Sequence, residues 1–202
     1  MRSFHLAFTL LAAHVVVACA APEHRPSQAA PTAVIVVPPA IVPTPVVDPA
    51  AARLGRLLAV APGLDAGVLA LALESRACAL RNGDTDADAR LAVIDYSLPS
   101  TAKRLWVLDM EREALLFHEH VTHGSGTGDN MARRFSNVEG SFATSLGLFR
   151  TAETYMGGNG YSLRMDGLDP GFNDAARQRA IVIHGAWYAN PDLIAKQGRL
   201  GR

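Results

Sequence analysis

The pattern of hydrophobic and polar positions predicts two helices at the start of the folded part of the chain. Residues 50–60 are rich in Ala and Leu and follow Asp48-Pro49, a pair that typically starts a helix. A second helix is predicted from Asp65, as its cap, to about Arg81, where Asn82-Gly83 ends it. One stripe of apolar positions is expected to be buried: Leu64, Val68, Leu71 and Cys78. Cys78 is therefore predicted to be a core thiol and not a nucleophile.

From residue 91 onward the pattern favours β-strands. Three β-prone runs separated by turn-like residues predict two antiparallel hairpins, over 91–96, 104–109 and 114–121. A glycine-rich, polar stretch at 124–145 is expected to be a flexible loop. Shorter strands are predicted at 145–151, 161–165 and 180–184, with a short helix at 172–179. Asn190-Pro191-Asp192 starts a last helix that ends at Gly198. The predicted fold class is mainly β (α+β), with N-terminal helices and short peripheral helices.

The first 49 residues are typical of an export signal and a spacer. Residues 1–20 have the shape of a secretory signal peptide, with Arg2 before an apolar stretch. The end of that stretch, Val16-Val17-Ala18-Cys19, favours a bacterial lipobox in which Cys19 becomes the lipidated first residue. Ordinary cleavage near Cys19 and an uncleaved anchor are the alternatives. Residues 21–49 carry eight prolines and predict a Pro-rich linker. The folded domain is expected at 50–202.

This organisation predicts a periplasmic protein, anchored to the outer membrane as a lipoprotein and touching the membrane only through its N-terminal lipid or signal. Nineteen Lys and Arg balance nineteen Asp and Glu. Zero net charge argues against nucleic acid as a partner, because binding phosphates needs a basic surface. The chain has two cysteines, Cys19 and Cys78. This number excludes a disulfide-rich scaffold and a four-cysteine zinc site.

Three histidines close together raise the possibility of a metal site. His118 and His120 share one face of a predicted strand, but Thr122 stands where an HExxH motif needs its second histidine. No other His or Cys cluster supplies further ligands, so strand histidines without a metal are the favoured interpretation. His123 precedes the glycine-rich run 124–129 and, of the three histidines, is the one favoured to face a cleft. That run lacks the Lys-Ser/Thr ending of a phosphate-binding loop.

The run from Ala180 to Gly185 is the most informative string. Its apolar residues predict a buried strand that delivers His184 at its tip, followed by Gly185. A histidine at a strand end, before a residue without a side chain, is well placed to face a cleft. A core histidine hydrogen-bonded to backbone fits the same pattern. The residues alone leave both interpretations open.

Several strings, taken in order, resemble one family over about residues 53–202. They are Ala92-Val93-Ile94-Asp95-Tyr96-Ser97, His123-Gly124, Arg134-Phe135-Ser136-Asn137, Ser145-Leu146-Gly147, Arg150-Thr151-Ala152-Glu153-Thr154-Tyr155, Gly160-Tyr161-Ser162-Leu163-Arg164, Gly171-Phe172-Asn173-Asp174, the AIVIHGAWY run 180–188, and Gly198-Arg199-Leu200-Gly201-Arg202. The chain resembles the murein L,D-transpeptidase catalytic-domain family. The resemblance implies a mostly antiparallel β domain that acts on peptidoglycan stem peptides without a cofactor or metal.

In this family a cysteine thiolate attacks a stem-peptide carbonyl, D-Ala leaves, and a diaminopimelate amine resolves the thioester to form a crosslink. The resemblance implies that His184 is the general base. It also implies substrate contacts at four residues: Gly185, His123, Asn137 and Tyr155. With water in place of the amine, the same chemistry trims stem peptides as a carboxypeptidase does.

The sequence departs from the family pattern at one point. After the string 198–202 the family continues with a Ser-x-Gly-Cys-Pro segment that carries the nucleophile, whereas the given sequence stops at Arg202. We expect a chain that is incomplete at its C-terminus, lacks the nucleophile and the last strand and helix, and is inactive as given. The alternatives are a non-catalytic, tethered peptidoglycan-binding lipoprotein, and an enzyme in which Cys78 takes the place of the nucleophile.

Overall fold

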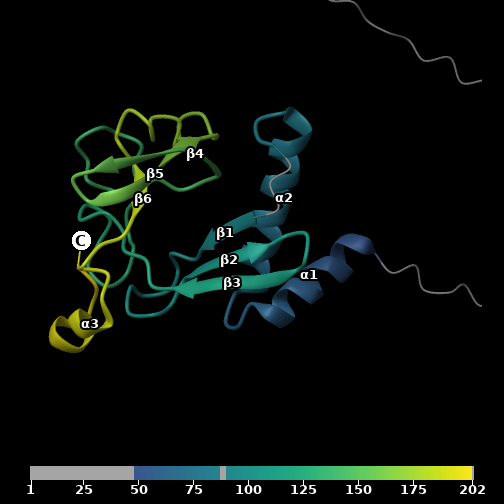
Figure 1. Cartoon of the computed structure of the whole chain (residues 1–202), viewed down its shortest axis with the longest axis horizontal. Helices are drawn as coiled ribbons and strands as arrows, with labels where there is room; N and C mark the ends of the chain where they lie inside the picture. The colour runs from purple at the N-terminus through teal and green to yellow at the C-terminus, as the bar shows by residue number, and fades with distance from the viewer. Residues whose placement is uncertain (1–47, 87–89, 202) are drawn as a thin grey trace, which may run out of the picture. The chain divides into compact units, whose positions relative to one another are not determined.

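The computed structural model describes residues 48–86 and 90–201 (Figure 1). The predicted signal peptide at 1–20, Cys19, and residues 21–47 of the predicted linker lie outside them. The elements follow in the order α1 (Pro49–Val60), α2 (Ala66–Asn82), β1 (Arg90–Ile94), β2 (Leu105–Asp109), β3 (Ala114–Glu119), β4 (Phe149–Gly157), β5 (Gly160–Gly167), β6 (Val182–His184) and α3 (Pro191–Gln197). The strands form two antiparallel sheets, which confirms the predicted mainly β (α+β) class. Within the described residues no helix has both the length and the apolar character needed to cross a membrane.

Side-chain caps fix where the first two helices begin and end, as the sequence predicts. The Asp48 carboxylate accepts a hydrogen bond from Ala50 N at 3.0 Å at the start of α1. The Asp65 carboxylate does the same for Val68 N, also at 3.0 Å, at the start of α2. Each bond satisfies a backbone N–H that has no partner within the helix. Gly83 ends α2 with a φ of 74°, a conformation that glycine adopts without strain.

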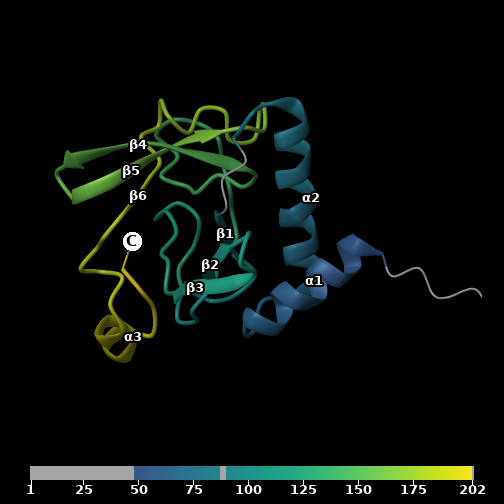
Figure 2. The same ribbon diagram turned by 45° about the vertical axis from the view of Figure 1, so that its right-hand side comes forward.

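The first sheet has the order β1-β2-β3 and carries the main core on one face. Leu91 lies opposite Leu108, and Val93 lies opposite Trp106, so four buried side chains share that face. Helices α1 and α2 cover it (Figure 2) with a core that includes Leu57 and Leu69, among other residues. The Trp106 indole N–H donates to Pro62 O at 3.0 Å, which satisfies the one polar atom of a fully buried side chain.

The prediction that Cys78 is a buried core thiol is wrong. Cys78 lies exposed on α2, and Leu71 of the predicted stripe is 65% exposed. The buried side chains of the helix are Leu69 and Ala79. The reason is that Ala and Leu occur all around α2, so the apolar period does not single out the face that packs. The Cys78 sulfur accepts a weak hydrogen bond from the Asn82 side-chain amide at 3.9 Å.

The second sheet has the order β4-β5-β6 and places the predicted catalytic histidine at its edge. Strands β4 and β5 form a hairpin whose pairing shifts between Thr151 and Thr154. Strand β6 pairs antiparallel with β5, and His184 lies opposite Ser162. Because β6 ends at His184, the ring stands where the chain leaves the sheet, as the sequence predicts.

Two elements differ from their predictions. Residues 145–148 are not strand, and β4 starts at Phe149 and runs on to Gly157. The helix predicted at 172–179 is a succession of turns. The reason lies in buried Asn173, whose side chain donates to Leu148 O and accepts from Asp169 N. Polar side chains that bond to the backbone in this way compete with helix formation.

The glycine-rich stretch after His123 packs closely against a second loop segment and contains no strand. A Cβ at Gly124 would lie 2.2 Å from Phe142 O, and one at Gly126 would lie 2.2 Å from Ser141 O. The Thr127 hydroxyl, buried at 1% exposure, accepts a hydrogen bond from Thr144 N at 2.7 Å. The glycines therefore have a packing role here, where the sequence favoured a flexible loop.

Candidate active site

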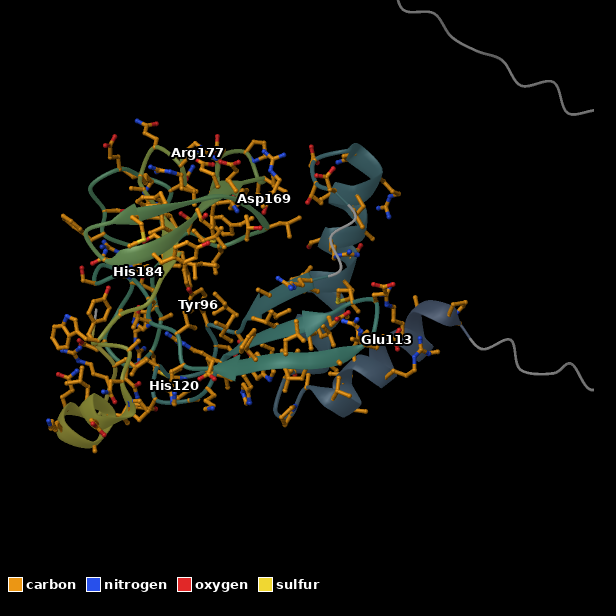
Figure 3. The ribbon with its side chains drawn as sticks, viewed as in Figure 1. Tyr96, Glu113, His120, Asp169, Arg177 and His184 are labelled. Carbon is orange, nitrogen blue, oxygen red and sulfur yellow. The ribbon has the colours of Figure 1, made fainter. Side chains whose placement is uncertain are left out.

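His184 has one ring nitrogen hydrogen-bonded to the backbone and lies where the chain leaves β6. Its Nδ1 lies 2.8 Å from Gly185 O. A backbone carbonyl only accepts hydrogen bonds, so Nδ1 carries a proton, and the neutral form of the ring has its lone pair on Nε2. The side chain is half-buried at the end of β6 (Figure 3), and its ring meets the edge of the Tyr188 ring at 6.4 Å between centroids. This arrangement has the tautomer and the accessibility that a general base needs.

Gly185 leaves open space next to this histidine. A Cβ placed on Gly185 would meet no atom within 4 Å, and the residue is exposed. Gly185 itself therefore adds no side chain to the path of a molecule that approaches His184. The geometry agrees with the predicted role of Gly185, and its contact with substrate stays a prediction.

A pocket of about 370 Å³ lies next to this region. We call it the Arg199 pocket, and its lining residues are Ser125, Trp187, Tyr188, Leu193, Gln197, Arg199 and Gly201. Tyr188 belongs to this lining and also contacts the His184 ring. Tyr188 therefore links the predicted base to the pocket.

Residues 199–201 are held in place by the loops before β2 and after β3. Leu200 is 1% exposed, and its N–H donates to Ser100 Oγ at 3.2 Å. The Ser100 hydroxyl donates in turn to Asn130 Oδ1 at 3.0 Å. Gly201 N donates to Tyr188 O at 2.9 Å. The chain therefore returns at Gly201 to the residue that contacts His184.

A buried arginine organises the loops that hold this segment. Arg104 is 0% exposed and donates to Leu98 O, to Val121 O and to His123 Nδ1, the last at 2.8 Å. Its guanidinium also lies 5.0 Å from the centre of the Tyr96 ring. Burial lowers the pKa of Arg104 from its usual value and raises the pKa of Tyr96. Arg104 therefore joins the end of β1, the end of β3 and the loop between β1 and β2.

The expectation that His123 faces a cleft is wrong. Its side chain is 4% exposed, with Nε2 at 3.2 Å from Gly128 O. Arginine only donates and a carbonyl only accepts, so Nδ1 takes the bond from Arg104 and the proton sits on Nε2. The ring is therefore held between two protein partners. Its predicted contact with substrate is untested, but the contacts present are with the protein.

The other two histidines of the group have separate partners. His118 stacks on Trp106 at 4.9 Å between ring centroids, and its Nε2 lies 3.1 Å from Lys103 O. His120 Nε2 lies 3.2 Å from Thr101 O. Among residues 48–86 and 90–201, no three His, Cys, Asp or Glu side chains gather closely enough to hold a metal ion.

Asn137 and Tyr155, the remaining predicted contact residues, occupy different settings. The Asn137 amide donates to Asp174 Oδ1 at 2.7 Å and its oxygen accepts from Ala175 N at 3.2 Å. It thereby ties its loop to the turns that follow β5. Tyr155 lies on β4 with the Arg164 guanidinium 4.3 Å from its ring centre. Both side chains are half-buried, and their contact with substrate stays a prediction.

A comparison with protein families matches residues 61–202 to the family described as the L,D-transpeptidase catalytic domain. The match covers both sheets, His184 and the Arg199 pocket. The chain belongs to this family. Comparisons with curated proteins and with solved structures gave no match.

L,D-transpeptidases of this family are cysteine-dependent enzymes that act on peptidoglycan, so the function is of the peptidoglycan transpeptidase type. The sequence singled out His184 and Gly185 correctly as residues at a strand end. It did not single out Ser100, Asn130 or Arg199. Of these three residues, only Arg199 lies within a string that carries the family resemblance, Gly-Arg-Leu-Gly-Arg at 198–202. The contacts that join them are set by the tertiary fold.

Proposed function

We propose that this L,D-transpeptidase domain transfers an acyl group of a tetrapeptide stem, with His184 as the general base. His184 Nε2 takes the proton of a cysteine thiol, and the thiolate adds to the stem carbonyl next to D-Ala. The C–N bond breaks, D-Ala leaves with the proton from the imidazolium, and a thioester remains. A diaminopimelate amine then attacks the thioester, the thiolate leaves, and the amine proton passes to His184. No cofactor takes part in these steps.

The tautomer of His184 is the observation that carries this proposal. The bond from Nδ1 to Gly185 O leaves Nε2 as the proton acceptor before substrate arrives. A base that is already in this tautomer can activate a thiol without rearranging first. The open space at Gly185 supports access by a bulky peptide.

Cys78 does not fit the role of nucleophile. It lies on α2, which is far from β6 in both ribbon views (Figures 1 and 2). The family's nucleophile follows the string that corresponds to 198–202, and Gly201 is hydrogen-bonded to Tyr188 beside His184. A cysteine a few residues after this string would therefore follow a segment that is already held next to Tyr188, the residue that contacts His184.

The test compares two proteins on muropeptides with tetrapeptide stems. One is the 202-residue chain, and the other is the same chain joined after Arg202 to a family-type C-terminal segment that carries Ser-x-Gly-Cys-Pro and the last strand and helix. We expect D-Ala release and crosslinked product, measured by chromatography and mass spectrometry, only from the second. In that protein His184→Gln should lower the rate by about 10²-fold or more. Arg81→Gln, an exposed change in α2, serves as the control.

Two results would replace this proposal. Turnover by the 202-residue chain that disappears in Cys78→Ser would make Cys78 the nucleophile. Binding of both proteins to sacculi, with no D-Ala released by either, would favour the non-catalytic peptidoglycan-binding lipoprotein. Sequencing the gene through the codon for Arg202 and beyond shows which protein the cell makes.

We propose further that the domain works in the periplasm, tethered to the outer membrane by a lipid on Cys19. The support is the lipobox-like string that ends at Cys19 and the Pro-rich residues 21–49, which give a spacer between membrane and wall. Labelling cells with a radioactive fatty acid should mark the protein, and Cys19→Ala should abolish the label. A protein that stays unlabelled and soluble in the periplasm would point to ordinary cleavage.

A further inference from the structure

The Arg199 pocket combines one cation with a lining that contains no carboxylate. The Arg199 side chain is 29% exposed, and its Nη1 donates to Leu200 O at 3.1 Å. The nearest carboxylate oxygen paired with it belongs to Asp129, at the long distance of 3.9 Å on a side chain that is 82% exposed. Such an exposed, loose ion pair holds a guanidinium weakly. Arg199 therefore has donor capacity left for an anionic group in the pocket.

Trp187 forms an apolar wall beside this cation. It is 81% exposed, and its ring meets the Tyr188 ring edge at 5.7 Å between centroids. An indole in this position leaves a large apolar surface in water, which a ligand with an apolar part would cover. The pocket thus offers an anion site and an apolar platform next to each other.

We propose that the Arg199 pocket binds a carboxylate of the peptidoglycan stem peptide, with Arg199 as the anchor and Trp187 covering the adjoining apolar part. This inference rests on the proposed function, because Tyr188 joins the pocket to His184. A stem peptide carries carboxylates close to the carbonyl that His184 would serve, and the pocket that shares Tyr188 with His184 would take one of them. Two carboxylates of the stem have this chemistry: the C-terminal one of D-Ala and the one on the side chain of diaminopimelate.

The two tryptophans of the chain give a direct optical test. Trp106 is fully buried, whereas Trp187 lines the pocket and is exposed. Titration of the 202-residue chain with a soluble tetrapeptide stem should therefore change the emission of Trp187, and Trp187→Phe should abolish the change. The measurement follows binding alone and does not need a nucleophile.

The next experiment varies the carboxylates of the peptide and the cationic side chains of the protein together. The peptides are the free acid, the C-terminal amide and the diaminopimelate amide. The proteins are the wild type, Arg199→Gln and Lys196→Gln. Lys196 is exposed on the neighbouring helix α3 and does not line the pocket. Lys196→Gln is therefore the matched control, because it also removes one positive charge but leaves the pocket unchanged. Circular dichroism melts of each variant show whether it is folded.

We expect one of the two amides to bind the wild type about tenfold more weakly than the free acid, which identifies the carboxylate that is read. Arg199→Gln should bind the acid and that amide equally, and Lys196→Gln should keep the difference. A difference that persists in Arg199→Gln would overturn the inference, as would equal binding of all three peptides by the wild type. Both results leave the proposed function in place. If the 202-residue chain binds no stem peptide at millimolar concentration, the inference fails, and D-Ala release by the chain joined to its nucleophile segment decides separately whether the proposed function stands.

Discussion

His184 and Tyr155 lie in one row across the second sheet, with Ser162 of the middle strand between them. Directly opposed residues on antiparallel strands share a face, so the three side chains are neighbours on one surface. Ser162 is 2% exposed, and its hydroxyl donates to Gly160 O at 3.0 Å. A small, buried side chain on β5 thus lies directly opposite His184 in this row.

Replacing Ser162 by Leu should displace His184 and leave the sheet folded. The larger side chain competes for the space of the imidazole, so we expect D-Ala release by the chain joined to its nucleophile segment to fall about tenfold or more. Ser162→Ala removes only the hydroxyl and should change the rate less than threefold, because its main cost is one hydrogen bond of about 1 kcal/mol. Equal rates for Leu and Ala would show that this row does not position the base.

Two substitutions of Tyr155 test whether this side chain stabilises the fold or contacts substrate. The Arg164 guanidinium lies 4.3 Å from its ring centre, and Tyr155→Leu should lower the free energy of unfolding by about 0.5–1 kcal/mol. Tyr155→Phe keeps the ring and should leave the stability in urea unchanged. If the predicted substrate contact uses the hydroxyl, Tyr155→Phe raises KM with kcat unaltered. An unchanged KM would show that the Tyr155 hydroxyl does not contact substrate.

The elements predicted correctly are those that local chemistry decides. Asp65 and Gly83 bracket α2 because capping acts within a few residues of the helix end. Strands β1 to β3 match the predicted runs, and each begins within one residue of its predicted start. They could be predicted because the alternation of apolar and polar residues and the turn residues between strands are local features of the sequence. His184 was placed at a strand end for the same reason.

The errors arise where distant partners decide. Cys78 was placed inside because α2 is apolar all around, and only packing against the first sheet selects its buried face. His123 was expected to face a cleft, but Arg104, nineteen residues earlier, holds it inside. Arg199 and Ser125 line one pocket although they are far apart in the sequence, and no periodic pattern connects them.

Arg104 should be sensitive even to a conservative change. Arg104→Lys keeps the charge but cannot reach Leu98 O, Val121 O and His123 Nδ1 together, so buried acceptors lose their donors. We expect the free energy of unfolding in urea to fall by about 2–3 kcal/mol. The control is Arg112→Lys, whose side chain is 81% exposed, where a change below about 0.5 kcal/mol is expected. Similar losses for both would mean that the buried network adds little.

The carboxylates around Arg177 should make the second sheet sensitive to acid. The hydrogen bond from Arg177 holds the pKa of Asp166 below its ordinary value of 3.8, and Arg150 adds a second bond at 3.1 Å. The folded carboxylate therefore takes up a proton at lower pH than the unfolded one. Its stabilising effect is fully present above the ordinary value and is lost as pH falls through the lowered folded value.

Asp166→Asn should accordingly lower Tm at about pH 6, and the difference from the wild type should shrink as the pH falls through the lowered folded pKa of Asp166. High salt should also reduce the difference at about pH 6, because Arg150 and Arg177 are exposed and salt screens their interaction with Asp166. Glu111→Gln removes an exposed carboxylate outside this network and serves as the control, with little change in Tm expected at about pH 6. A difference between Asp166→Asn and wild type that stays constant with pH would show that the Arg177 pairing contributes no stability, and that the acid sensitivity of the fold has another source.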